Sequence, residues 1–313
     1  MARIAFMFPG QGSQKVGMGR EFAERYPELV ERYFKPADDI LGYGLTELCF
    51  NGPEEALRRT DNTQPAIFLV SMAILDLLRK QGVRPEAAVG HSLGEYSALV
   101  CAGVLRFEDA LRLVRRRGEL MAAVNQRTPG AMAAVLGLAP DQVDAVCTAA
   151  RDEGAGVVEA ANYNTPEQTV ISGEAGAVQR AIALAKEAGA ERVVPLQVGA
   201  PFHCSLMDDM GAEFAAELDK YHFADPQIPV IANVAGDYVR TAAEVKDALR
   251  RQVAGSVRWT ATMQRLAADG YDTFIEVGPG RVLTGMNMKI NPDLPAYGSE
   301  DQRRLDALLA KLA

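Results

Sequence analysis

The sequence contains few of the residues that build metal sites, disulfide scaffolds or membrane spans. It has three histidines in 313 residues, and its four cysteines are scattered without a Cys-x-x-Cys pair. This usage argues against a zinc site or a disulfide framework and for a reducing compartment. No stretch approaches the roughly 20 apolar residues that cross a bilayer, and the first residues show no secretory leader pattern. We therefore expect a cytoplasmic protein with no metal, no membrane association and no nucleotide cofactor.

Positive charge is also in deficit, because 33 lysines and arginines face 41 aspartates and glutamates, for a net charge of −8. An acidic balance argues against nucleic-acid binding. Four arginines nevertheless gather in one helical stretch, at Arg112, Arg115, Arg116 and Arg117. For the first three, the usual behaviour of charge runs predicts a solvated helix face.

Short apolar strands alternate with helical patterns along most of the chain. Strands are predicted at 4–8, 87–90, 228–231 and 271–277, with helices between them. This alternation indicates a mostly parallel sheet covered by helices. Thr63-Gln64-Pro65 is predicted to break the chain before a helix at 66–78.

Residues 131 to 198 follow a different order. Strands are predicted at 131–138, 157–161, 168–172 and 192–198, and helices at 140–152 and 175–188. The order βαββαβ is typical of a ferredoxin-like unit. We therefore predict an α/β protein in which residues 1–129 and 199–313 form a large, α/β-hydrolase-like domain. Residues 130–198 form an inserted ferredoxin-like subdomain.

Ser92 is the strongest candidate for a chemical role. It lies in Gly90-His91-Ser92-Leu93-Gly94, directly after a predicted strand and before a helical pattern. Strand, sharp turn and helix are the context in which Gly-x-Ser-x-Gly presents a nucleophile, with helix amides and the helix dipole close behind it. A plain tight turn is the alternative.

A serine nucleophile needs a base, and the chain offers three histidines. His91 adjoins Ser92, where neighbouring side chains at a turn diverge, so we expect a structural role. His222 precedes a proline and is predicted to be partly buried. His203 follows the strand predicted at 192–198, and loops after strands carry function in α/β folds. Elimination therefore favours His203.

Together these residues and several further motifs resemble the malonyl-CoA:acyl-carrier-protein transacylases and the related acyltransferases of polyketide synthases. The resemblance covers essentially the whole chain. Its motifs are Phe8 to Gln14, Thr63 to Ala66, Gly90 to Ser97, Arg117-Gly118 with Met121, Gly130 to Ala133, Asn162 to Gly173, Phe202-His203, Val257 to Trp259 and Glu276 to Gly280.

The resemblance implies a role for each motif. Ser92 would attack a malonyl thioester, His203 would take its proton, and the backbone carbonyl of Gln252 would orient the histidine. The amides of Gln11 and Leu93 would form the oxyanion hole. A phosphate-binding loop at 10–19 is the alternative for that segment, but the Gly-Lys-Ser/Thr ending is absent.

By the same resemblance, Arg117 would pair with the free carboxylate of the malonyl group, a bidentate contact that an acetyl group cannot make. Gln64, Asn164, Met121 and Phe202 would border the substrate. Phe202 departs from the many housekeeping members that carry serine before the histidine. Polyketide acyltransferases selective for malonyl often carry phenylalanine there, and its ring would exclude an α-branched substrate.

The implied reaction is a ping-pong transfer from malonyl-CoA, through Ser92, to the phosphopantetheine thiol of an acyl-carrier protein. The carrier is acidic by family expectation, so a basic patch should flank the cleft, with candidates at Lys186, Arg192, Arg281 and Lys289. We expect a monomer. Whether the protein serves fatty-acid or polyketide synthesis is open.

Two other functions compete with acyl transfer. A serine hydrolase of the α/β-hydrolase type would use Ser92 and His203 with Asp144 or Asp152, but those acids fall in the predicted insertion. A non-enzymatic carrier-binding module would have no reason to combine a serine, a histidine and Arg117.

Overall fold

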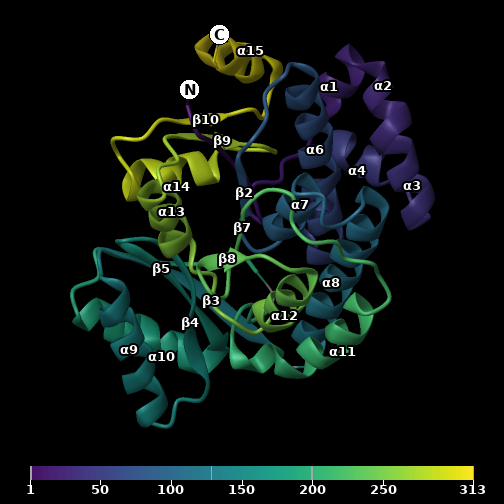
Figure 1. Cartoon of the computed structure of the whole chain (residues 1–313). Coiled ribbons are helices and arrows are strands. Elements are labelled where there is room, and N and C mark those ends of the chain that lie inside the picture. The colour runs from purple at the N-terminus through teal and green to yellow at the C-terminus, as the bar shows by residue number, and fades with distance from the viewer. Residues whose placement is uncertain (1, 128, 199, 313) are drawn as a thin grey trace.

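The computed structural model describes residues 2–127, 129–198 and 200–312, and it contains two sheets (Figure 1). The larger sheet has the order β10-β9-β1-β2-β7-β8. Its neighbouring strands are parallel except for the β7–β8 pair. The predicted mostly parallel sheet is therefore confirmed. Its strands are β1 (Ile4–Phe8), β2 (Ala87–Gly90), β7 (Val230–Ala232), β8 (Asp237–Val239), β9 (Thr273–Glu276) and β10 (Ala296–Gly298).

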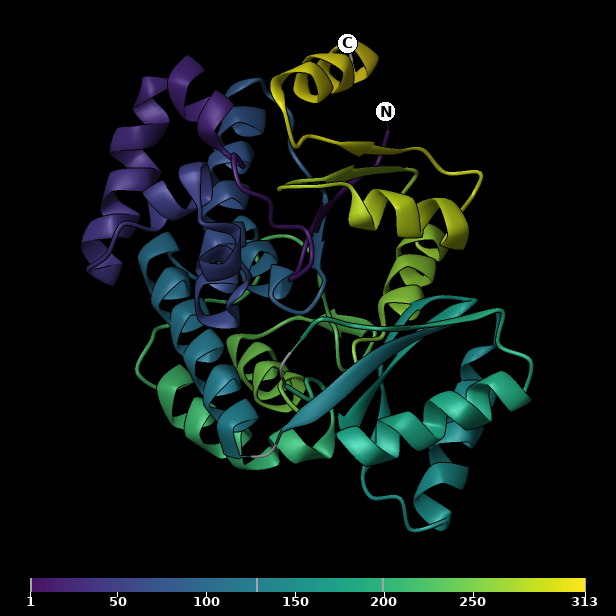
Figure 2. The same ribbon diagram turned by 180° about the vertical axis from the view of Figure 1, so that it is seen from behind.

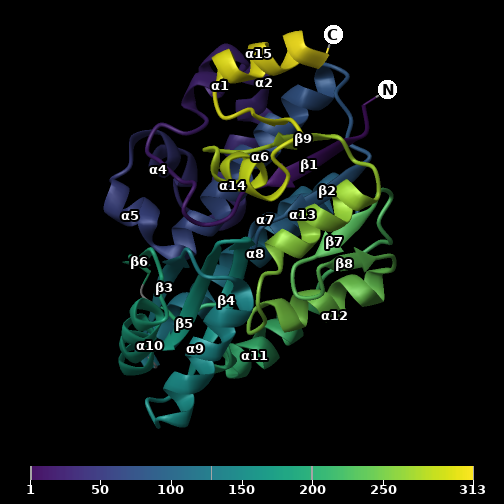
Figure 3. The ribbon, with the colours of Figure 1, turned by 90° about the vertical axis from the view of Figure 1, so that its left-hand side faces the viewer.

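Both faces of this sheet are buried, and β1 shows how the sequence achieves this. Phe6 and Phe8 point into one apolar core, while Ala5 and Met7 point into another, as the two-residue period of a strand requires. Helices α6 (Thr60–Lys80), α7 (Gly94–Cys101) and α8 (Phe107–Arg127) pack in the first core. Helices α13 (Trp259–Ala268) and α14 (Val282–Ile290) pack in the second (Figure 3).

The remaining helical segments surround these layers. They are α1 (Arg20–Arg25), α2 (Pro27–Leu29), the π-helical turn Val30–Phe34, α3 (Lys35–Leu41), α4 (Leu45–Asn51), α5 (Glu54–Arg58), the 3₁₀ turn Ser205–Met207, α11 (Asp208–Leu218), α12 (Ala242–Gln252) and α15 (Gln302–Leu312). Among the described residues, none of the helices has the length and apolar character needed to span a membrane.

The smaller sheet is antiparallel, with the order β4-β5-β3-β6. This is the order of a ferredoxin-like unit, as predicted, and its two helices cover one face (Figure 2). The exact limits of the two domains stay a prediction, and their ends at residues 1, 199 and 313 lie outside the described ranges. The elements are β3 (Gly130–Leu136), α9 (Pro140–Asp152), β4 (Val158–Thr165), β5 (Gln168–Glu174), α10 (Ala175–Glu187) and β6 (Arg192–Pro195).

The smaller sheet is joined to the rest of the molecule by strand-like pairing. The amide of Val257 donates to the carbonyl of Ala161 at 2.8 Å, and the amide of Tyr163 donates to the carbonyl of Val257 at 2.9 Å. Asn162 and Val257 thus form an isolated parallel bridge. The segment after α12 therefore borders β4 as a short extra strand.

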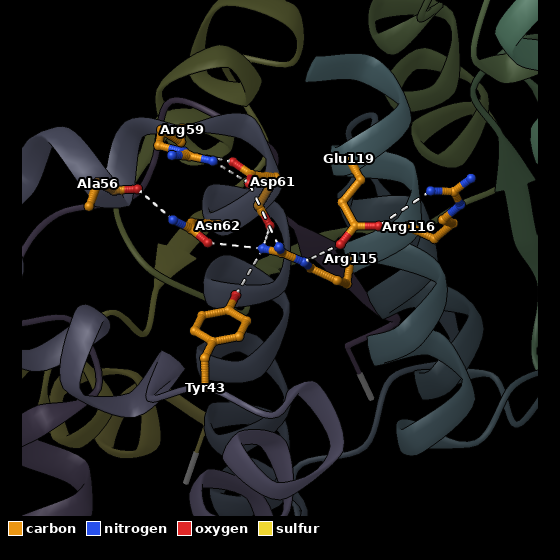
Figure 4. Close-up of polar contacts among 8 residues, drawn as sticks. All are labelled: Tyr43, Ala56, Arg59, Asp61, Asn62, Arg115, Arg116 and Glu119. Atoms are coloured by element: carbon orange, nitrogen blue, oxygen red, sulfur yellow. Dashed lines mark hydrogen bonds and ion pairs between the residues drawn. The ribbon is translucent and has the colours of Figure 1, made fainter. Parts of the chain in front are cut away.

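The predicted break at Thr63-Gln64-Pro65 is wrong, because α6 runs through Pro65 without ending. Proline has no N–H, so the carbonyl of Asp61, four residues earlier, loses its helical donor. Arg115 on α8 replaces that donor, because its Nη1 lies 2.8 Å from the Asp61 carbonyl oxygen (Figure 4). A side chain from a neighbouring helix thus allows the proline to remain inside α6.

The same contacts correct the prediction that Arg115 lies on a solvated face. Only 24% of its side chain is exposed. Its Nη1 also donates to Asn62 Oδ1 and Tyr43 Oη, and its Nε donates to Glu119 Oε1 at 2.8 Å (Figure 4). Arg112, with 45% of its side chain exposed, fits the solvated face better.

We predict that Arg115→Ala lowers the free energy of unfolding by about 2 kcal/mol, since hydrogen bonds to a charged group are lost and the Asp61 carbonyl is left without a donor. Urea denaturation measures this change. The matched control is Arg112→Ala on the same helix, which should change stability by less than about 0.5 kcal/mol. Equal effects of the two variants would contradict the role assigned to Arg115.

Candidate active site

Ser92 lies on a sharp turn between β2 and α7, with its backbone in the left-handed region at a φ of 52°. Holding a non-glycine residue there costs about 1–2 kcal/mol. The glycines on either side allow the turn to close. A Cβ on Gly90 would lie 1.9 Å from the carbonyl carbon of Gly94, and a Cβ on Gly94 would lie 2.0 Å from the carbonyl oxygen of Phe8. The Gly-x-Ser-x-Gly spacing is therefore a steric requirement of this elbow.

Asn233, directly after β7, holds the elbow from outside. Its Oδ1 accepts from the Ser92 amide at 2.6 Å, and its Nδ2 donates to the Gly90 carbonyl at 2.7 Å. The side chain is buried and bonds backbone groups on both sides of the turn. Sequence analysis missed this residue, since an isolated asparagine after a short strand carries no recognisable signal.

The structure brings Ser92, His203 and Gln252 together. Ser92 Oγ lies 2.7 Å from His203 Nε2. His203 Nδ1 faces two backbone carbonyls, that of Gln252 at 2.9 Å and that of Gly255 at 3.1 Å. Because carbonyls only accept, the ring proton belongs on Nδ1, which leaves Nε2 free to accept from the serine hydroxyl.

The surroundings of His203 keep its ring neutral. Burial, together with the positive charge of Arg117, lowers the pKa of His203 to about 3. A neutral ring accepts a proton, so the pair can act as nucleophile and general base. The other two histidines are placed differently. His91 bonds Asn164 and packs edge-on against Trp259. His222 is exposed, so its predicted partial burial is wrong.

Arg117, on α8, is 1% exposed and points at the nucleophile. Its Nη2 lies 3.1 Å from Ser92 Oγ and 3.1 Å from Gln252 Oε1, and its Nη1 donates to Gln64 Oε1 at 2.7 Å. Within the described ranges no carboxylate forms an ion pair with it, and its Nε has no partner. Burial lowers the pKa of Arg117, but a guanidinium stays charged in proteins. Among the described residues, the hydrogen-bond partners of this buried cation are neutral, and the Glu95 carboxyl acts on it through charge without an ion-pair contact.

Gln64, Met121 and Gln11 belong to the same cluster. Gln64 Nε2 lies 3.2 Å from Met121 Sδ and 3.2 Å from Thr60 Oγ1. Thr60 Oγ1 in turn donates to Gln11 Oε1 at 2.7 Å. Gln11 follows β1, which runs parallel to β2, and Phe8 at the end of β1 pairs with Gly90 at the end of β2. The two strands therefore end side by side, and the loop that carries Gln11 lies next to the elbow.

Two backbone amides at the elbow are free to bind an oxyanion. In the described part of the chain, neither the Gln11 amide nor the Leu93 amide has a hydrogen-bond partner. Leu93 is the residue at the N-terminal cap of α7, where the positive end of the helix dipole lies. Such amides can stabilise negative charge that develops beside Ser92.

A pocket of about 340 Å³ lies next to this site, since Gln11 and Phe202, the neighbour of His203, are among its lining residues. Arg58 and Arg59, both largely exposed, also line it. Phe202 is 8% exposed. The volume is in the range of small-molecule binding pockets.

The remaining predicted residues lie further from the nucleophile. Asn164, at the end of β4, accepts through its Oδ1 from His91 Nε2 at 2.8 Å, and so touches the elbow through that residue. The basic candidates are all exposed but fall on two parts of the molecule. Lys186 and Arg192 belong to the smaller sheet and its helices, while Arg281 and Lys289 lie at the two ends of α14. The described residues contain no cluster of three or more His, Cys, Asp or Glu side chains that could hold a metal ion.

Glu95 is a further residue at the site that sequence analysis missed. It lies three residues after Ser92, is 1% exposed, and accepts from the Asn233 amide and from Gln252 Nε2. The spacing Ser-x-x-Glu at a helix start is that of a capping box, and this signal could have identified it. In the structure the glutamate contacts residues from other elements instead of the Ser92 amide.

The chain is similar to known proteins over most of its length. The acyl transferase domain family matches residues 5–289. The malonyl CoA-acyl carrier protein transacylase of Bacillus subtilis (strain 168) is 42% identical over 312 residues, covering 100% of this chain and 98% of the relative. That of Escherichia coli (strain K12) is 44% identical over 310 residues and covers 99% of each chain.

Solved structures are equally similar. A malonyl-transacylase in complex with its type II PKS acyl-carrier protein is 41% identical, with a TM-score of 0.95, over 99% of this chain and 100% of that one. The malonyl-CoA:acyl carrier protein transacylase of Xanthomonas oryzae pv. oryzae is also 41% identical, with a TM-score of 0.95, over 99% and 98%.

The fold, the serine elbow and the family match define an acyltransferase. Within that class, the chain belongs to the malonyl CoA-acyl carrier protein transacylase family, since relatives of that name match it over its whole length.

The lowered pKa of His203 predicts that the free energy of unfolding depends on pH. The folded-state value of about 3 lies below the usual value of 6.5, so the unfolded chain binds a proton that the folded protein does not. The stability that comes from keeping His203 neutral is therefore fully present above pH 6.5 and is lost as the pH falls towards 3. The free energy of unfolding falls by at most about 1.4 kcal/mol per pH unit in that range.

Urea denaturation between pH 7 and pH 4 checks this expectation. His203→Gln should lose stability less steeply with falling pH than the unmodified protein does. The control is His222→Gln, which removes an exposed histidine and should leave the slope unchanged. Parallel curves for the protein and its His203 variant would contradict the lowered pKa.

Proposed function

We propose that this protein transfers a malonyl group from malonyl-CoA to the phosphopantetheine thiol of an acyl-carrier protein, through an acyl intermediate on Ser92. One observation carries the assignment of malonyl. The guanidinium of Arg117 is buried 3.1 Å from the Ser92 hydroxyl and has no carboxylate partner among the described residues. A substrate that carries a carboxylate beside its reacting thioester would supply the ion-pair partner that Arg117 lacks.

In the first half-reaction, His203 Nε2 accepts the hydroxyl proton while Ser92 Oγ attacks the thioester carbon. The carbon–sulfur bond breaks, CoA leaves as a thiol with the proton from His203, and malonyl-Ser92 remains. In the second half-reaction, the carrier thiol gives its proton to His203 and attacks the ester. The proton then returns to Ser92 Oγ as the malonyl carrier leaves.

The carbonyls of Gln252 and Gly255 hold the histidine during both steps, where serine proteases use a carboxylate. They fix the tautomer by accepting from Nδ1–H. The amides of Gln11 and Leu93 stabilise the oxyanion of each tetrahedral intermediate. One such donor is worth roughly a hundredfold to a thousandfold in rate.

Arg117 pairs with the malonyl carboxylate, and its existing contacts to Gln64 and Gln252 hold the guanidinium in place. Met121 fixes Gln64 from its other side, and Asn164 supports the elbow through His91. The ring of Phe202 narrows the pocket, which disfavours an α-methyl branch on the substrate.

The contacts of His203 do not favour the serine-hydrolase alternative. Such an enzyme needs a carboxylate at Nδ1, but two backbone carbonyls occupy that side. Asp144, one of the two acids considered, lies on α9 and accepts instead from Tyr163 Oη at 2.8 Å. Asp152 ends the same helix.

The partner is an acyl-carrier protein, and α14 is one candidate surface for it. Arg281 and Lys289 flank this helix, and Val282 and Met288, 42% and 64% exposed, lie between them. A face with apolar side chains between two cations suits an acidic partner helix. Lys186 and Arg192 remain candidates on the smaller sheet. No cofactor is needed for the steps above, and we propose a monomer.

We predict that exposure to malonyl-CoA adds one malonyl group to the protein, and that addition of the phosphopantetheine form of a carrier removes it. Intact-protein mass spectrometry measures both steps. Ser92→Ala should abolish the mass increase, because the attacking oxygen is absent. Ser97→Ala, the control on the same helix, should retain it. A mass increase that survives Ser92→Ala would overturn the assignment.

We also predict that Arg117→Ala loses malonyl loading by about a thousandfold, since breaking a buried ion pair costs about 3–5 kcal/mol. Loading of acetyl should rise relative to malonyl, because the unpaired buried cation no longer penalises it. Competition between malonyl-CoA and acetyl-CoA gives the ratio. Arg116→Ala is the control, since that side chain pairs with Glu119 and Glu213 away from the site. An unchanged ratio in Arg117→Ala would remove Arg117 from recognition.

A further inference from the structure

Glu95 is a buried acid that no step of the reaction above uses. It lies in the first turn of α7 and is 1% exposed. A single oxygen, Oε2, accepts from the backbone amide of Asn233 at 3.0 Å and from Gln252 Nε2 at 2.8 Å. Its two partners come from the segments after β7 and at the end of α12, so one carboxylate joins three elements behind the elbow.

The contacts of Gln252 show what this carboxylate does. Its Nε2 donates to Glu95 and to the Ser92 carbonyl, at 2.8 and 3.0 Å, and its Oε1 accepts from Arg117 at 3.1 Å. An amide turned by 180° would direct its NH₂ at the guanidinium, donor against donor. Glu95 Oε2 already accepts from the Asn233 backbone amide, so it faces Gln252 as an acceptor too. Together with the Ser92 carbonyl it holds the NH₂ end and thereby directs the oxygen to Arg117.

Asn233 carries a second consequence of the same contact. Glu95 binds its main-chain amide, while its side chain bonds the Ser92 amide and the Gly90 carbonyl. Asn233, which holds the elbow, and Gln252, which contacts the guanidinium, therefore both donate a hydrogen bond to Glu95 Oε2.

We infer that Glu95 is a positioning residue for malonyl selection, which holds the Gln252 side chain so that its oxygen faces Arg117. The inference rests on the proposed function, because it concerns the selectivity of that same site. Among the described residues, Glu95 makes no hydrogen bond to the nucleophile hydroxyl or to the base. It acts through its hydrogen bonds to Gln252 and Asn233, and its charge also attracts the Arg117 guanidinium directly.

The test compares the malonyl-to-acetyl loading ratio of Ser92 in several variants of the full chain. Glu95→Ala should lower the ratio about tenfold, since a mispositioned hydrogen bond to a charged group is lost. Glu95→Gln keeps an acceptor oxygen at the same place and should restore the ratio to within about threefold. A purely structural role would lower total activity and stability without moving the ratio.

Glu276 offers a matched control. It is equally buried, burial raises the pKa of both acids to about 7, and its carboxylate accepts only from Leu283 and Thr284 at the start of α14. Glu276→Ala should therefore destabilise the protein without changing the loading ratio.

A double-mutant cycle separates action through Gln252 from any other cause. Gln252→Ala keeps the backbone carbonyl that holds His203 and removes the side-chain amide. In that background, Glu95→Ala should lower the ratio much less, because the group that it positions is gone and only its direct charge effect on Arg117 remains. An equal effect in both backgrounds, or an unchanged ratio in Glu95→Ala, would overturn the inference.

Failure of the proposed function would be recognised separately. If the unmodified protein formed no malonyl-Ser92, the function would be wrong whatever the variants did. If malonyl-Ser92 formed normally and the loading ratio were the same in the Glu95 variants as in the unmodified protein, only the positioning role would be wrong. Should Glu95→Ala not fold, Glu95→Asp, which withdraws the carboxylate by one methylene, provides the same comparison and should lower the ratio in the same direction.

Discussion

The left-handed backbone of Ser92 is the constraint on which the site depends, because it turns the hydroxyl out of the path of the chain and towards His203. Such a conformation persists only where the surroundings enforce it. Here the glycines at 90 and 94 remove the Cβ atoms that would collide with backbone, and Asn233 bonds the turn on both sides. The ring of His203, the second described non-glycine residue with a positive φ, is held by two backbone carbonyls. Each of the two residues is therefore held by hydrogen bonds between a side chain and the backbone.

A buried cation is the second organising feature. Burying a guanidinium without a carboxylate partner is unfavourable, and neutral amide oxygens offset only part of the lost hydration. The hydrogen-bond partners of Arg117 come from α6, the turn between β2 and α7, and α12, so three segments around α8 contribute to keeping this charge in place. In the proposed function this imbalance would favour a charged acyl group, since a neutral acyl group would displace solvent without supplying a partner for the charge.

The sequence was sufficient for features that depend on local spacing. Gly-x-Ser-x-Gly between a strand and a helix located the elbow, and strand and helix periodicity predicted both sheets, including the order of the smaller one. Features that depend on distant partners were not accessible in this way. Pro65 stays helical because Arg115, fifty residues later, supplies the hydrogen-bond donor for the Asp61 carbonyl, and no local sequence pattern predicts this contact. Gln252 was reached only through family resemblance, because a backbone carbonyl has no side-chain signature. The edge strands β8 and β10, at three residues each, were too short to show a period.

The pairing of Val257 with β4 gives the smaller sheet a mechanical connection to the chemistry. The carbonyls of Gln252 and Gly255 hold the His203 ring, and Ser256 alone separates Gly255 from Val257, whose backbone pairs with Ala161 and Tyr163. A displacement of the smaller sheet would pull on this short tether and so rotate the histidine relative to Ser92. The position of the smaller sheet and the orientation of the His203 ring are thus coupled through one short segment of chain.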